Sequence, residues 1–476
     1  MNYELLNYLE SSIDRHWIKY YADELLSNKE EQEYASKIIY QRIKDKIDII
    51  FAAIQHSEKI TIFVAETNPL EFIAAFLAGV ITEVNVFLCN PSWQQQEWQQ
   101  VLNLVIPDLV FGDETVSQIA ELELTNQQLL SIKRKEFNTR SHIMIPTGGT
   151  SGEIKFAIHT WETLSASVNG FKTFFECEKI NSVCTLPLYH VSGLMQLMRS
   201  LLTQGNLIIC SYKSVIQQLV SEHKSTYFIS FVPTQLQYLI ELNPYWLKEF
   251  KTILVGGAPP KRSLLNSARK YNISVALTYG MTETASGIIA LTPKEFLAGN
   301  DSNGRVLPHV KVAIEKPKNK IGLITINSTS LCLGYYPQLL SPTDSLVTDD
   351  LGYFDREGYL YLVGRDSQKI ITGGENVFPA EVEKAIYATN LIKDVCVIGI
   401  PDNKWGQAVT AIYVPTTKSV LDSVKQQLRS QLAKYKQPKN WIEVDYIPRN
   451  NRGKINYQEL KAIAIEAMGK HATVET

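Results

Sequence analysis

The chain has 476 residues, which is more than one hydrophobic core normally serves, so we expect at least two domains. Its composition is that of an ordinary globular enzyme, and a formal net charge of −2 argues against a bulk field that would attract nucleic acid or an anionic membrane. The longest apolar run, 72–81, is too short to span a bilayer, and the first residues lack the basic and apolar regions of a secretion signal. Six cysteines without Cys-x-x-Cys spacing predict reduced thiols, and therefore a cytoplasmic location, rather than disulfides or a zinc site.

The first 300 residues alternate between short apolar runs and segments of helical spacing. Residues 1–58 are predicted to be mainly helical, and a further helix is predicted at 69–80. Strands are predicted at 60–64, 84–89, 109–111, 183–186, 206–210, 227–232, 252–255 and 275–277. This alternation is typical of βαβ units around parallel sheets, in which ligands bind at the carboxyl ends of the strands.

After Gly304 the pattern changes. Short strands separated by turns are predicted at 310–314, 322–326 and 359–363, which indicates a β subdomain. From Lys369 onward helices and strands are mixed over roughly a hundred residues, an ordinary domain size. The predicted fold class is therefore α/β, with a large N-terminal domain of parallel βαβ sheets and a β subdomain (1–365) and a small α+β C-terminal domain (369–476).

One stretch combines glycines, hydroxyls and a lysine in a way that suits an anion. It runs from Pro146 to Lys155 and reads Pro-Thr-Gly-Gly-Thr-Ser-Gly-Glu-Ile-Lys. Glycines let backbone N–H groups approach a polyphosphate, the hydroxyls add donors and the lysine adds a positive charge. The spacing fits neither the Walker A motif nor the dinucleotide fingerprint. An ordinary surface loop is the alternative that the composition leaves open.

Several other segments with glycine, hydroxyl or titratable residues follow in a fixed order. They are Pro187–Gly193, Gly256–Ala258, Tyr279–Glu283, Thr348–Tyr353, Gly364–Arg365, Gly373–Asn376, Tyr435–Pro438 and Gly453–Ile455. Together with the glycine stretch they resemble the signatures of the adenylate-forming superfamily, which comprises acyl- and aryl-CoA ligases, the adenylation domains of peptide synthetases and luciferases. The resemblance runs from about residue 60 to about residue 460. It departs from the superfamily at Gly148, Ser151 and Ile154, which replace Ser, Thr and Pro, and at Asp349, which replaces Gly.

The resemblance implies that the protein activates a carboxylic acid with ATP and passes the acyl group to CoA. The residues that would bind ATP are Thr147, Gly148, Gly149, Thr150, Ser151, Gly152, Lys155, Gly257, Ala258, Tyr279, Gly280, Met281, Thr282, Asp350 and Arg365. Glu283, which we count with the catalytic residues, would hold Mg²⁺, a hard cation that prefers carboxylate oxygens. Lys454 would be the catalytic lysine that bridges the acyl carboxylate and the α-phosphate, where negative charge develops.

The same resemblance places the acyl group and CoA. His190 would line the acyl or thiol path, and we count it with both the catalytic and the substrate-binding residues. The substrate-binding residues would be His190, Ser192, Gly193, Thr284 and Ser286. Gly373 and Gly374 would reach CoA after the C-terminal domain rotates about a hinge at 366–368. The hinge residue would be Gln368, where relatives carry Asp or Lys, or its neighbour Lys369.

Within the superfamily, the closest resemblance is to the o-succinylbenzoate–CoA ligases of menaquinone and phylloquinone synthesis. It rests on the short segment ahead of the glycine stretch, on the run 279–293, and on the Gly-Gly variant followed by Phe156–Trp161. o-Succinylbenzoate has two carboxylates and only one is activated, so the other needs a donor-rich pocket. The alternatives are another aryl- or acyl-CoA ligase, an adenylation enzyme that serves a carrier protein, and a non-enzymatic ligand-binding relative. A homo-oligomer is compatible with the sequence.

Overall fold

The structure is a computed structural model of the whole chain. It describes residues 2–21, 35–54, 60–113, 141–148, 153–216, 224–318, 320–340, 345–373, 375–402, 405–417, 419–449 and 455–472. The chain forms two compact units. The first comprises Met1–Gly257, Leu264–Lys311 and Asn327–Ser345, and the second comprises Ala258–Ser263, Val312–Ile326 and Leu346–Thr476.

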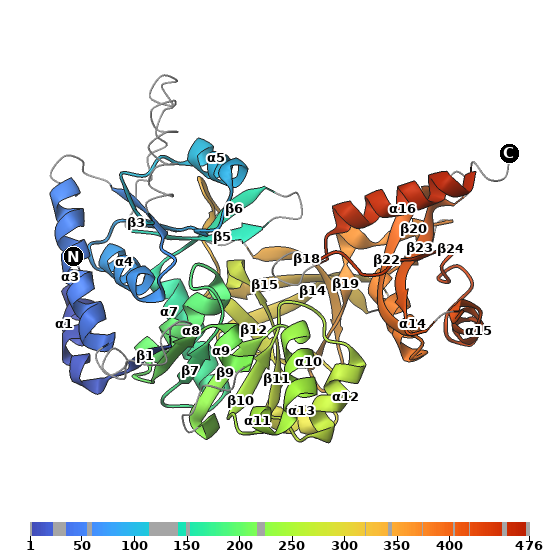
Figure 1. The fold of residues 1–476 in the computed structure, drawn as a ribbon, viewed down its shortest axis with the longest axis horizontal. Coiled ribbons are helices and arrows are strands. Elements are labelled where there is room, and N and C mark those ends of the chain that lie inside the picture. Colours follow the sequence, from blue (N-terminus) through green and yellow to red (C-terminus); the bar gives the residue numbers. More distant parts are fainter. Residues whose placement is uncertain are drawn as a thin grey trace. The chain divides into compact units, whose positions relative to one another are not determined.

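The first unit contains an eight-stranded sheet in the order β1-β8-β7-β9-β10-β11-β12-β13 (Figure 1). Its strands are β1 (Ile18–Tyr21), β7 (Asn181–Cys184), β8 (Leu207–Cys210), β9 (Tyr227–Phe231), β10 (Thr252–Val255), β11 (Val275–Met281), β12 (Ser286–Ala290) and β13 (Arg305–Val306). Pairing is parallel from β1 to β11 and antiparallel at β12 and β13. The carboxyl ends of β7 to β11 therefore share one edge of this sheet.

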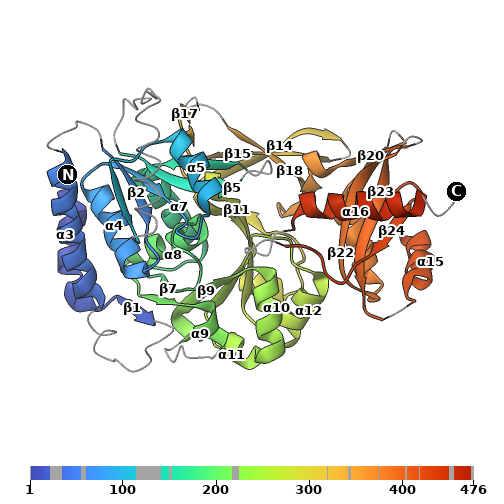
Figure 2. The same ribbon diagram turned by 45° about the horizontal axis from the view of Figure 1, so that its top comes forward.

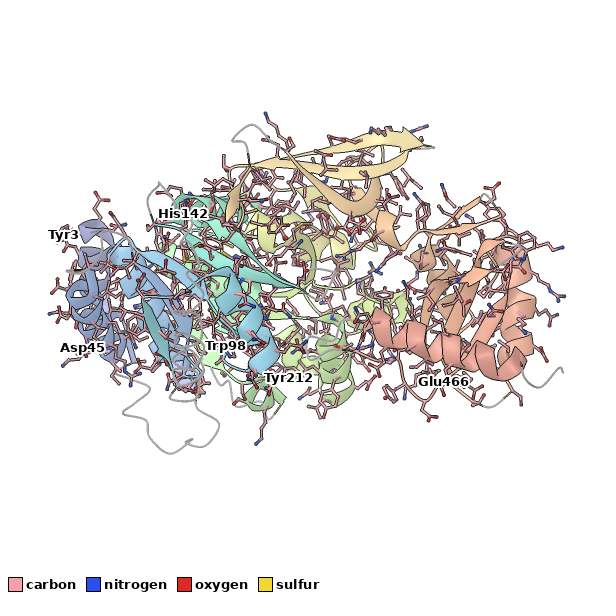
Figure 3. The ribbon with its side chains drawn as sticks, turned by 90° about the horizontal axis from the view of Figure 1, so that it is seen from above. Tyr3, Asp45, Trp98, His142, Tyr212 and Glu466 are labelled. Atoms are coloured by element: carbon pink, nitrogen blue, oxygen red, sulfur yellow. The ribbon has the colours of Figure 1, made fainter. Side chains whose placement is uncertain are left out.

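A second, seven-stranded sheet has the order β17-β16-β6-β5-β3-β2-β4. Its strands are β2 (Thr61–Ala65), β3 (Asn85–Leu88), β4 (Leu109–Gly112), β5 (Ile143–Gly148), β6 (Ile154–His159), β16 (Gly334–Tyr335) and β17 (Gln338–Leu339). One face packs an aromatic cluster in which Phe63 contacts both Phe87 and Trp98, and Trp98 is labelled in Figure 3. β2 to β5 pair in parallel, while β5 and β6 form an antiparallel pair.

The helices up to residue 297 cover these sheets. They are α1 (Tyr3–Ser11), α3 (Ala35–Ile54), α4 (Pro69–Ile81), α5 (Gln95–Leu104), α7 (Trp161–Phe174), α8 (Val191–Leu202), α9 (Tyr212–Ile216), α10 (Pro233–Leu242), α11 (Pro244–Lys248), α12 (Arg262–Lys270) and α13 (Pro293–Leu297). Short 3₁₀ turns lie at η1 (Ile13–Arg15), η2 (Lys224–Thr226) and η3 (Thr282–Thr284).

The helix α4 shows how local sequence sets these boundaries. The Asn68 side chain accepts hydrogen bonds from the N–H groups of Leu70 and Glu71, and Pro69 occupies the first turn, where its missing N–H costs nothing. A Cβ on Gly79 would lie 2.6 Å from the side chain of Val86, so glycine lets the helix pack close to β3. Although α4 is apolar except at Glu71, no helix within the described ranges is long and apolar enough to cross a bilayer.

The second unit holds most of a four-stranded sheet and all of a five-stranded sheet. The four-stranded sheet has the order β14 (Val310–Lys318), β15 (Ile321–Ser328), β18 (Leu346–Phe354) and β19 (Leu360–Arg365). The 3₁₀ turn η4 (Asp366–Gln368) follows β19 directly. The five-stranded sheet contains β20 (Ile370–Thr372), β21 (Glu375–Val377), β22 (Ile392–Asp402), β23 (Gly406–Pro415) and β24 (Asn440–Glu443).

The five-stranded sheet is covered on both faces (Figure 2). Val395 and Val397 of β22 face α14 (Pro379–Ala388) and α15 (Leu421–Gln431), whereas the alternate residues Cys396 and Ile398 pack with α16 (Tyr457–Ala472). This alternation is the two-residue period of a strand buried on both sides.

The predicted α/β class is confirmed, and four local expectations are corrected. The strand β1 was not predicted, because its support is a partner almost two hundred residues away, with Ile18 opposite Leu207. β11 continues to Met281 instead of ending at residue 277, since its last residues pair with β12. Thr147 and Gly148 belong to β5 rather than to a loop. The polar run that begins with Gly364 and Arg365 could from its sequence be a linker, but these two residues belong to β19, because they pair with β18.

Candidate active site

The glycine stretch begins and ends in an antiparallel pair of strands. Thr147 lies opposite Lys155, and Gly148 lies opposite Ile154. Directly opposed residues share a face of the sheet, so the exposed Lys155 side chain is on the same face as the side chain of Thr147. The remaining predicted phosphate ligands, Gly149, Thr150, Ser151 and Gly152, lie outside the described residues.

The segment that resembles Pro-Leu-x-His-x-x-Gly follows β7 and starts α8. His190 caps this helix, and its carbonyl accepts hydrogen bonds from the N–H groups of Gly193 and Leu194. A Cβ on Gly193 would lie 2.2 Å from the Pro187 carbonyl oxygen, so the close approach requires glycine here. Ser192 is exposed in the first turn. The structure therefore places His190, Ser192 and Gly193 together at the carboxyl end of β7.

The segment Tyr279–Glu283 turns sharply at the end of β11. The pairing with β12 slips between Tyr279 and Gly280, and a Cβ on Gly280 would lie 2.0 Å from the Ser286 carbonyl oxygen. Met281 and Thr282 lead directly into η3. Elsewhere on the same edge, Gly257 has a φ of +81°, which favours glycine after β10. Contact between the Tyr279 side chain and ATP stays a prediction.

Buried hydrogen bonds hold this turn in place. The Thr284 side chain is fully buried. Its hydroxyl accepts a hydrogen bond from the Met281 N–H and lies 2.7 Å from the Ser286 carbonyl oxygen. His159, which we did not predict, places Nε2 2.8 Å from the Thr282 carbonyl and Nδ1 3.0 Å from the Thr163 hydroxyl. Burial lowers the pKa of His159 to about 4, so the ring is neutral and Nε2 donates to the carbonyl.

The Glu283 carboxylate is almost completely buried, with 9% exposure. It accepts a hydrogen bond of 2.6 Å from the hydroxyl of Tyr335 on β16. Burial, and then the negative charge of Glu283, raise the pKa of that hydroxyl, so it remains a donor. Among the described residues, no Lys, Arg or His forms an ion pair with Glu283. A buried carboxylate without a cation suits the Mg²⁺ predicted here.

Arg199 of α8 is a candidate site residue that sequence reasoning missed. Its side chain is 5% exposed, and one guanidinium N–H donates to the Ser286 hydroxyl at 3.1 Å. The group lies 4.1 Å from the centroid of the Phe171 ring, and its Nε has no hydrogen-bond partner among the described residues. Burial lowers the pKa of Arg199 to about 10. A single arginine in the apolar run Leu-Met-Arg-Ser-Leu-Leu was the available signal.

Ser286, the partner of Arg199, stands on strained backbone. Ala285 and Ser286 have φ angles of +50° and +89°, in the left-handed region that residues other than glycine rarely adopt. Such strain persists where the surroundings impose it, often at functional sites. Here the buried Ser167 hydroxyl donates to the Ala285 carbonyl at 2.6 Å. The Arg199–Ser286 pair is therefore fixed from both sides.

In the second unit, Asp350 and Arg365 lie opposite each other on β18 and β19. The Arg365 Nε lies 3.2 Å from Asp350 Oδ1, and the Arg365 side chain is 44% exposed. Asp349, where the superfamily has glycine, accepts hydrogen bonds from the N–H and hydroxyl of Ser367 in η4. Asp349, the residue that departs from the superfamily, thus holds η4, the turn that ends at the predicted hinge residue Gln368.

The remaining predicted residues also fall in the second unit. Gln368 hydrogen-bonds the Tyr457 hydroxyl of α16, and Ala258 is half-buried. Gly373 has a φ of +60°, and its N–H donates to the Trp405 carbonyl at 2.8 Å. Gly374 and the predicted catalytic residue Lys454 lie outside the described residues. Their roles, like the domain boundaries, stay predictions.

Comparison with known proteins identifies related chains. The family model of AMP-binding enzymes matches residues 39–336, and the model of the AMP-binding enzyme C-terminal domain matches residues 381–454. A 2-succinylbenzoate–CoA ligase of Bacillus velezensis is 34% identical over 421 residues, which cover 83% of this chain and 86% of the relative. The enzyme of that name from Oceanobacillus iheyensis is 30% identical, covering 82% of this chain and 85% of the relative.

Solved structures share the fold. The o-succinylbenzoate CoA synthetase (MenE) of Bacillus subtilis in complex with the acyl-adenylate OSB-AMP has a TM-score of 0.79 at 23% identity, over 96% of this chain and 97% of that one. ATP-bound MatB of Rhodopseudomonas palustris has a TM-score of 0.79 at 22% identity, over 97% of this chain and 99% of that one.

Proposed function

Because the chain belongs to the AMP-binding enzyme family, we propose that it is an AMP-forming o-succinylbenzoate–CoA ligase of menaquinone or phylloquinone synthesis. The observation that carries the choice of acid is the buried guanidinium of Arg199, which is bonded to Ser286 and has no carboxylate partner among the described residues. The names of the relatives from Bacillus velezensis and Oceanobacillus iheyensis support the same choice.

The reaction would proceed in two steps. A carboxylate oxygen of the acid attacks the α-phosphorus of ATP and pyrophosphate leaves, which gives an acyl-adenylate. The sulfur of CoA then attacks the acyl carbon and AMP leaves. A free carboxylate is a poor electrophile, because its own charge repels the nucleophile and oxide is a very poor leaving group. Exchange of oxide for AMP overcomes both obstacles.

The first step gathers negative charge, so the protein must supply cations and donors. Thr147 and Lys155, which lie opposite each other on β5 and β6, would hold phosphate oxygens. Mg²⁺, bound by Glu283 and phosphate oxygens, would neutralise part of the polyphosphate charge. Asp350 would accept hydrogen bonds from the ribose hydroxyls. Lys454 would contact the acyl carboxylate and the α-phosphate.

The second carboxylate of the acid would supply the anionic partner that the buried Arg199 guanidinium needs. A buried cation is strongly destabilised unless an anion pairs with it. A monocarboxylic acid would use its one carboxylate at phosphorus and leave Arg199 unpaired. A diacid would pair the guanidinium, whose unpartnered Nε and remaining N–H groups can bind a carboxylate in a fork.

Two analogues of o-succinylbenzoate test this proposal. One is 4-oxo-4-phenylbutanoate, which lacks the aromatic carboxylate, and the other is 2-butanoylbenzoate, which lacks the aliphatic one. We expect ATP-dependent CoA-thioester formation with the diacid at a KM ~30-fold or more below that of the analogue that keeps the activated carboxylate. Equal KM values for the diacid and that analogue would contradict a role for a second carboxylate.

The proposed partners are small molecules: the acid, ATP and CoA. We place the enzyme in the cytoplasm. The six cysteines all lie within the described ranges and none forms a disulfide, which supports a reducing compartment.

A further inference from the structure

The residues 281–286, which we call the site turn, contain both the predicted Mg²⁺ ligand Glu283 and the predicted acid-binding residue Ser286. The carbonyl groups of its four central residues all accept hydrogen bonds from outside the turn. In the order of residues 282 to 285, the donors are His159 Nε2 at 2.8 Å, the Cys332 N–H at 2.8 Å, the Ser330 hydroxyl at 3.1 Å and the Ser167 hydroxyl at 2.6 Å. The site turn is therefore held along its length and not only at its ends.

The donors come from three different parts of the first unit. His159 is the last residue of β6, Ser167 lies in α7, and Ser330 and Cys332 lie in the connection between β15 and β16. The three side-chain donors, His159, Ser167 and Ser330, are 123, 118 and 46 residues away from their acceptors. Bonds of such long separation fix the place of the site turn within the unit.

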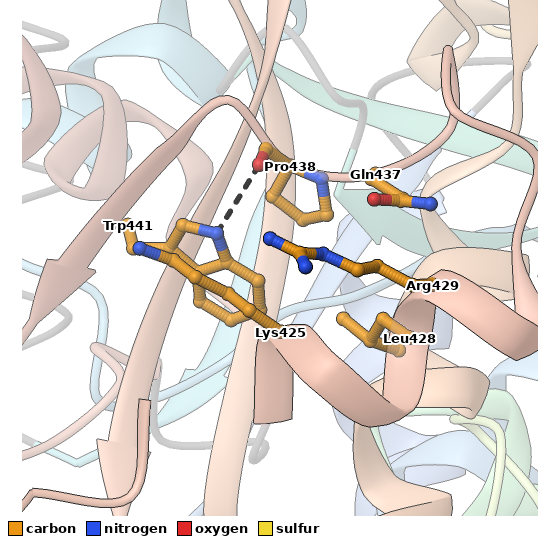
Figure 4. Close-up of a pocket in the computed structure, with 6 residues that line it drawn as sticks. All are labelled: Lys425, Leu428, Arg429, Gln437, Pro438 and Trp441. Atoms are coloured by element: carbon orange, nitrogen blue, oxygen red, sulfur yellow. Dashed lines mark hydrogen bonds between the residues drawn. The ribbon is translucent and has the colours of Figure 1, made fainter. Parts of the chain in front are cut away.

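A pocket in the second unit shows the contrast with local hydrogen bonds. Between α15 and β24, the Trp441 indole N–H donates to the Pro438 carbonyl at 3.2 Å (Figure 4). The Gln437 amide donates to the Leu432 carbonyl at 2.9 Å. These bonds span three and five residues, so they shape a single connection and do not join separate elements.

Burial makes the three side-chain donors hard to replace. His159 and Ser330 are completely buried, and Ser167 is 1% exposed. The Ser330 hydroxyl is held in turn by Ser328, whose hydroxyl lies 2.9 Å from it and 3.1 Å from the His309 carbonyl. Bulk solvent does not reach such positions, so it cannot replace a donor that a substitution removes.

The strained backbone makes the site turn depend on these donors. Ala285 and Ser286 both have positive φ angles. Strain of this kind costs about as much free energy as one or two buried hydrogen bonds contribute. Loss of one donor therefore lets the backbone relax, and the residues beside the lost bond move most.

We propose that the three side-chain donors are positioning residues that fix the spacing between the Glu283 carboxylate and the Ser286 hydroxyl. The inference rests on the proposed function, in which Glu283 serves Mg²⁺ and Ser286 serves the second carboxylate of the acid. The site turn would thus present the metal ligand and the acid ligand as one rigid unit.

Each donor acts at a different point of the site turn. His159 bonds to residue 282, which adjoins Glu283, and Ser167 bonds to residue 285, which adjoins Ser286. Ser330 bonds to residue 284, which lies between the two ligands. Substitution of the three donors should therefore affect metal and acid binding to different extents.

Equilibrium binding measures both ends of the site turn without turnover. The Kd for o-succinylbenzoate is obtained by titration calorimetry with Mg²⁺ and α,β-methylene-ATP, which cannot release pyrophosphate. The Kd for Mn²⁺, used in place of Mg²⁺, is obtained by electron paramagnetic resonance with ATP and no acid.

Three variants separate the two ends. Ser167→Ala should raise the Kd for the acid ~5-fold and leave the Kd for Mn²⁺ unchanged. His159→Asn keeps a polar group near Thr163 but cannot reach the Thr282 carbonyl, so it should raise the Kd for Mn²⁺ ~5-fold and leave the Kd for the acid unchanged. Ser330→Ala should raise both constants by ~3-fold.

Two further variants exclude a merely structural effect. His159→Gln retains a donor that reaches the Thr282 carbonyl and should restore the Kd for Mn²⁺. Ser12→Ala removes an equally buried hydroxyl, which donates to the Tyr8 carbonyl at 2.8 Å, and should lower the urea midpoint without changing either Kd.

The pattern of the two constants decides the outcome. Equal increases of both constants in Ser167→Ala and His159→Asn, or no increase in either variant, would overturn the proposal. Absence of acid-dependent pyrophosphate exchange in the wild type would instead count against the proposed function. In that case the Kd for Mn²⁺ in His159→Asn and His159→Gln still tests whether the donor positions Glu283.

Discussion

Replacing Arg199 with methionine should make the protein more stable and its substrate binding weaker. The substitution Arg199→Met keeps a long side chain and removes the charge. Burial lowers the pKa of Arg199 from 12.5 to about 10, which corresponds to ~3 kcal/mol against the charged form. The hydrogen bond to Ser286 and the Phe171 ring offset part of this cost. We therefore expect the free energy of unfolding to rise by ~1–3 kcal/mol.

The effect on the substrate has the opposite sign. Truncating one partner of a buried charge pair typically costs about 2–5 kcal/mol. Taking ~2–4 kcal/mol, the KM for o-succinylbenzoate should rise by roughly 30- to 900-fold. The KM values for ATP and for the matched monocarboxylic analogue should change little. Urea unfolding at pH 7.5 gives the first quantity, and pyrophosphate-release kinetics give the second.

Arg199→Lys is the control, because it retains the charge but loses the fork of donors, and should give an intermediate KM. A methionine variant that is less stable than the wild type and still prefers the diacid would exclude this role of Arg199. Equal increases in KM for the diacid and the monocarboxylic analogue would exclude it as well, since they would indicate general damage to the binding site.

The other predictions concern the charge of Lys454, the hydrogen bond from Tyr335 to Glu283, the protonation of His159 and the domain rotation at Gln368. Lys454→Ala should lower the adenylation rate by about 10²–10³-fold while the mutant still converts supplied acyl-adenylate to thioester, and unchanged pyrophosphate release would exclude the assigned role. Tyr335→Phe removes the donor to Glu283, so half-maximal pyrophosphate exchange should need ~10-fold more Mg²⁺, and an unchanged Mg²⁺ requirement would argue against a positioning role. Stability that depends on neutral His159 is complete above pH 6.5 and is lost as the pH falls toward 4. The loss between pH 7.5 and pH 5 is ~2 kcal/mol of the free energy of unfolding. In urea unfolding, His159→Gln should therefore reduce the change in this free energy over the same pH range by ~2 kcal/mol. Gln368→Pro should preserve adenylate formation and impair thioester formation, whereas parallel loss of both steps would exclude Gln368 as the hinge.

Features with a local cause could be predicted from the sequence. The helix α4 begins where predicted because its start is set by two adjacent residues, Asn68 at the N-cap and Pro69 in the first turn. The strand β10 has the predicted bounds, Thr252–Val255, because an apolar run ends in two glycines. The resemblance to known signatures supplied roles for residues such as Glu283 that spacing alone could not assign.

Features that depend on distant partners could not be predicted. Arg199 meets Ser286 from 87 residues away, and the Tyr335 hydroxyl reaches Glu283 across 52 residues. His159 reaches the Thr282 carbonyl across 123 residues. Apart from Arg199, a lone cation in an apolar run, these residues do not stand out in their own segments, and only the packing of strands and helices brings the pairs together. The strand β1 was missed for the same reason, since four residues contain too little periodicity to reveal their partner.

We propose above all that the protein joins a dicarboxylic acid to AMP. Exchange of labelled pyrophosphate into ATP, measured with purified protein, Mg²⁺ and no CoA, tests it most directly. We expect rapid exchange with o-succinylbenzoate, and exchange at least ~30-fold less efficient with the analogue that lacks the second carboxylate. No exchange with o-succinylbenzoate, or equal exchange with both acids, would contradict it.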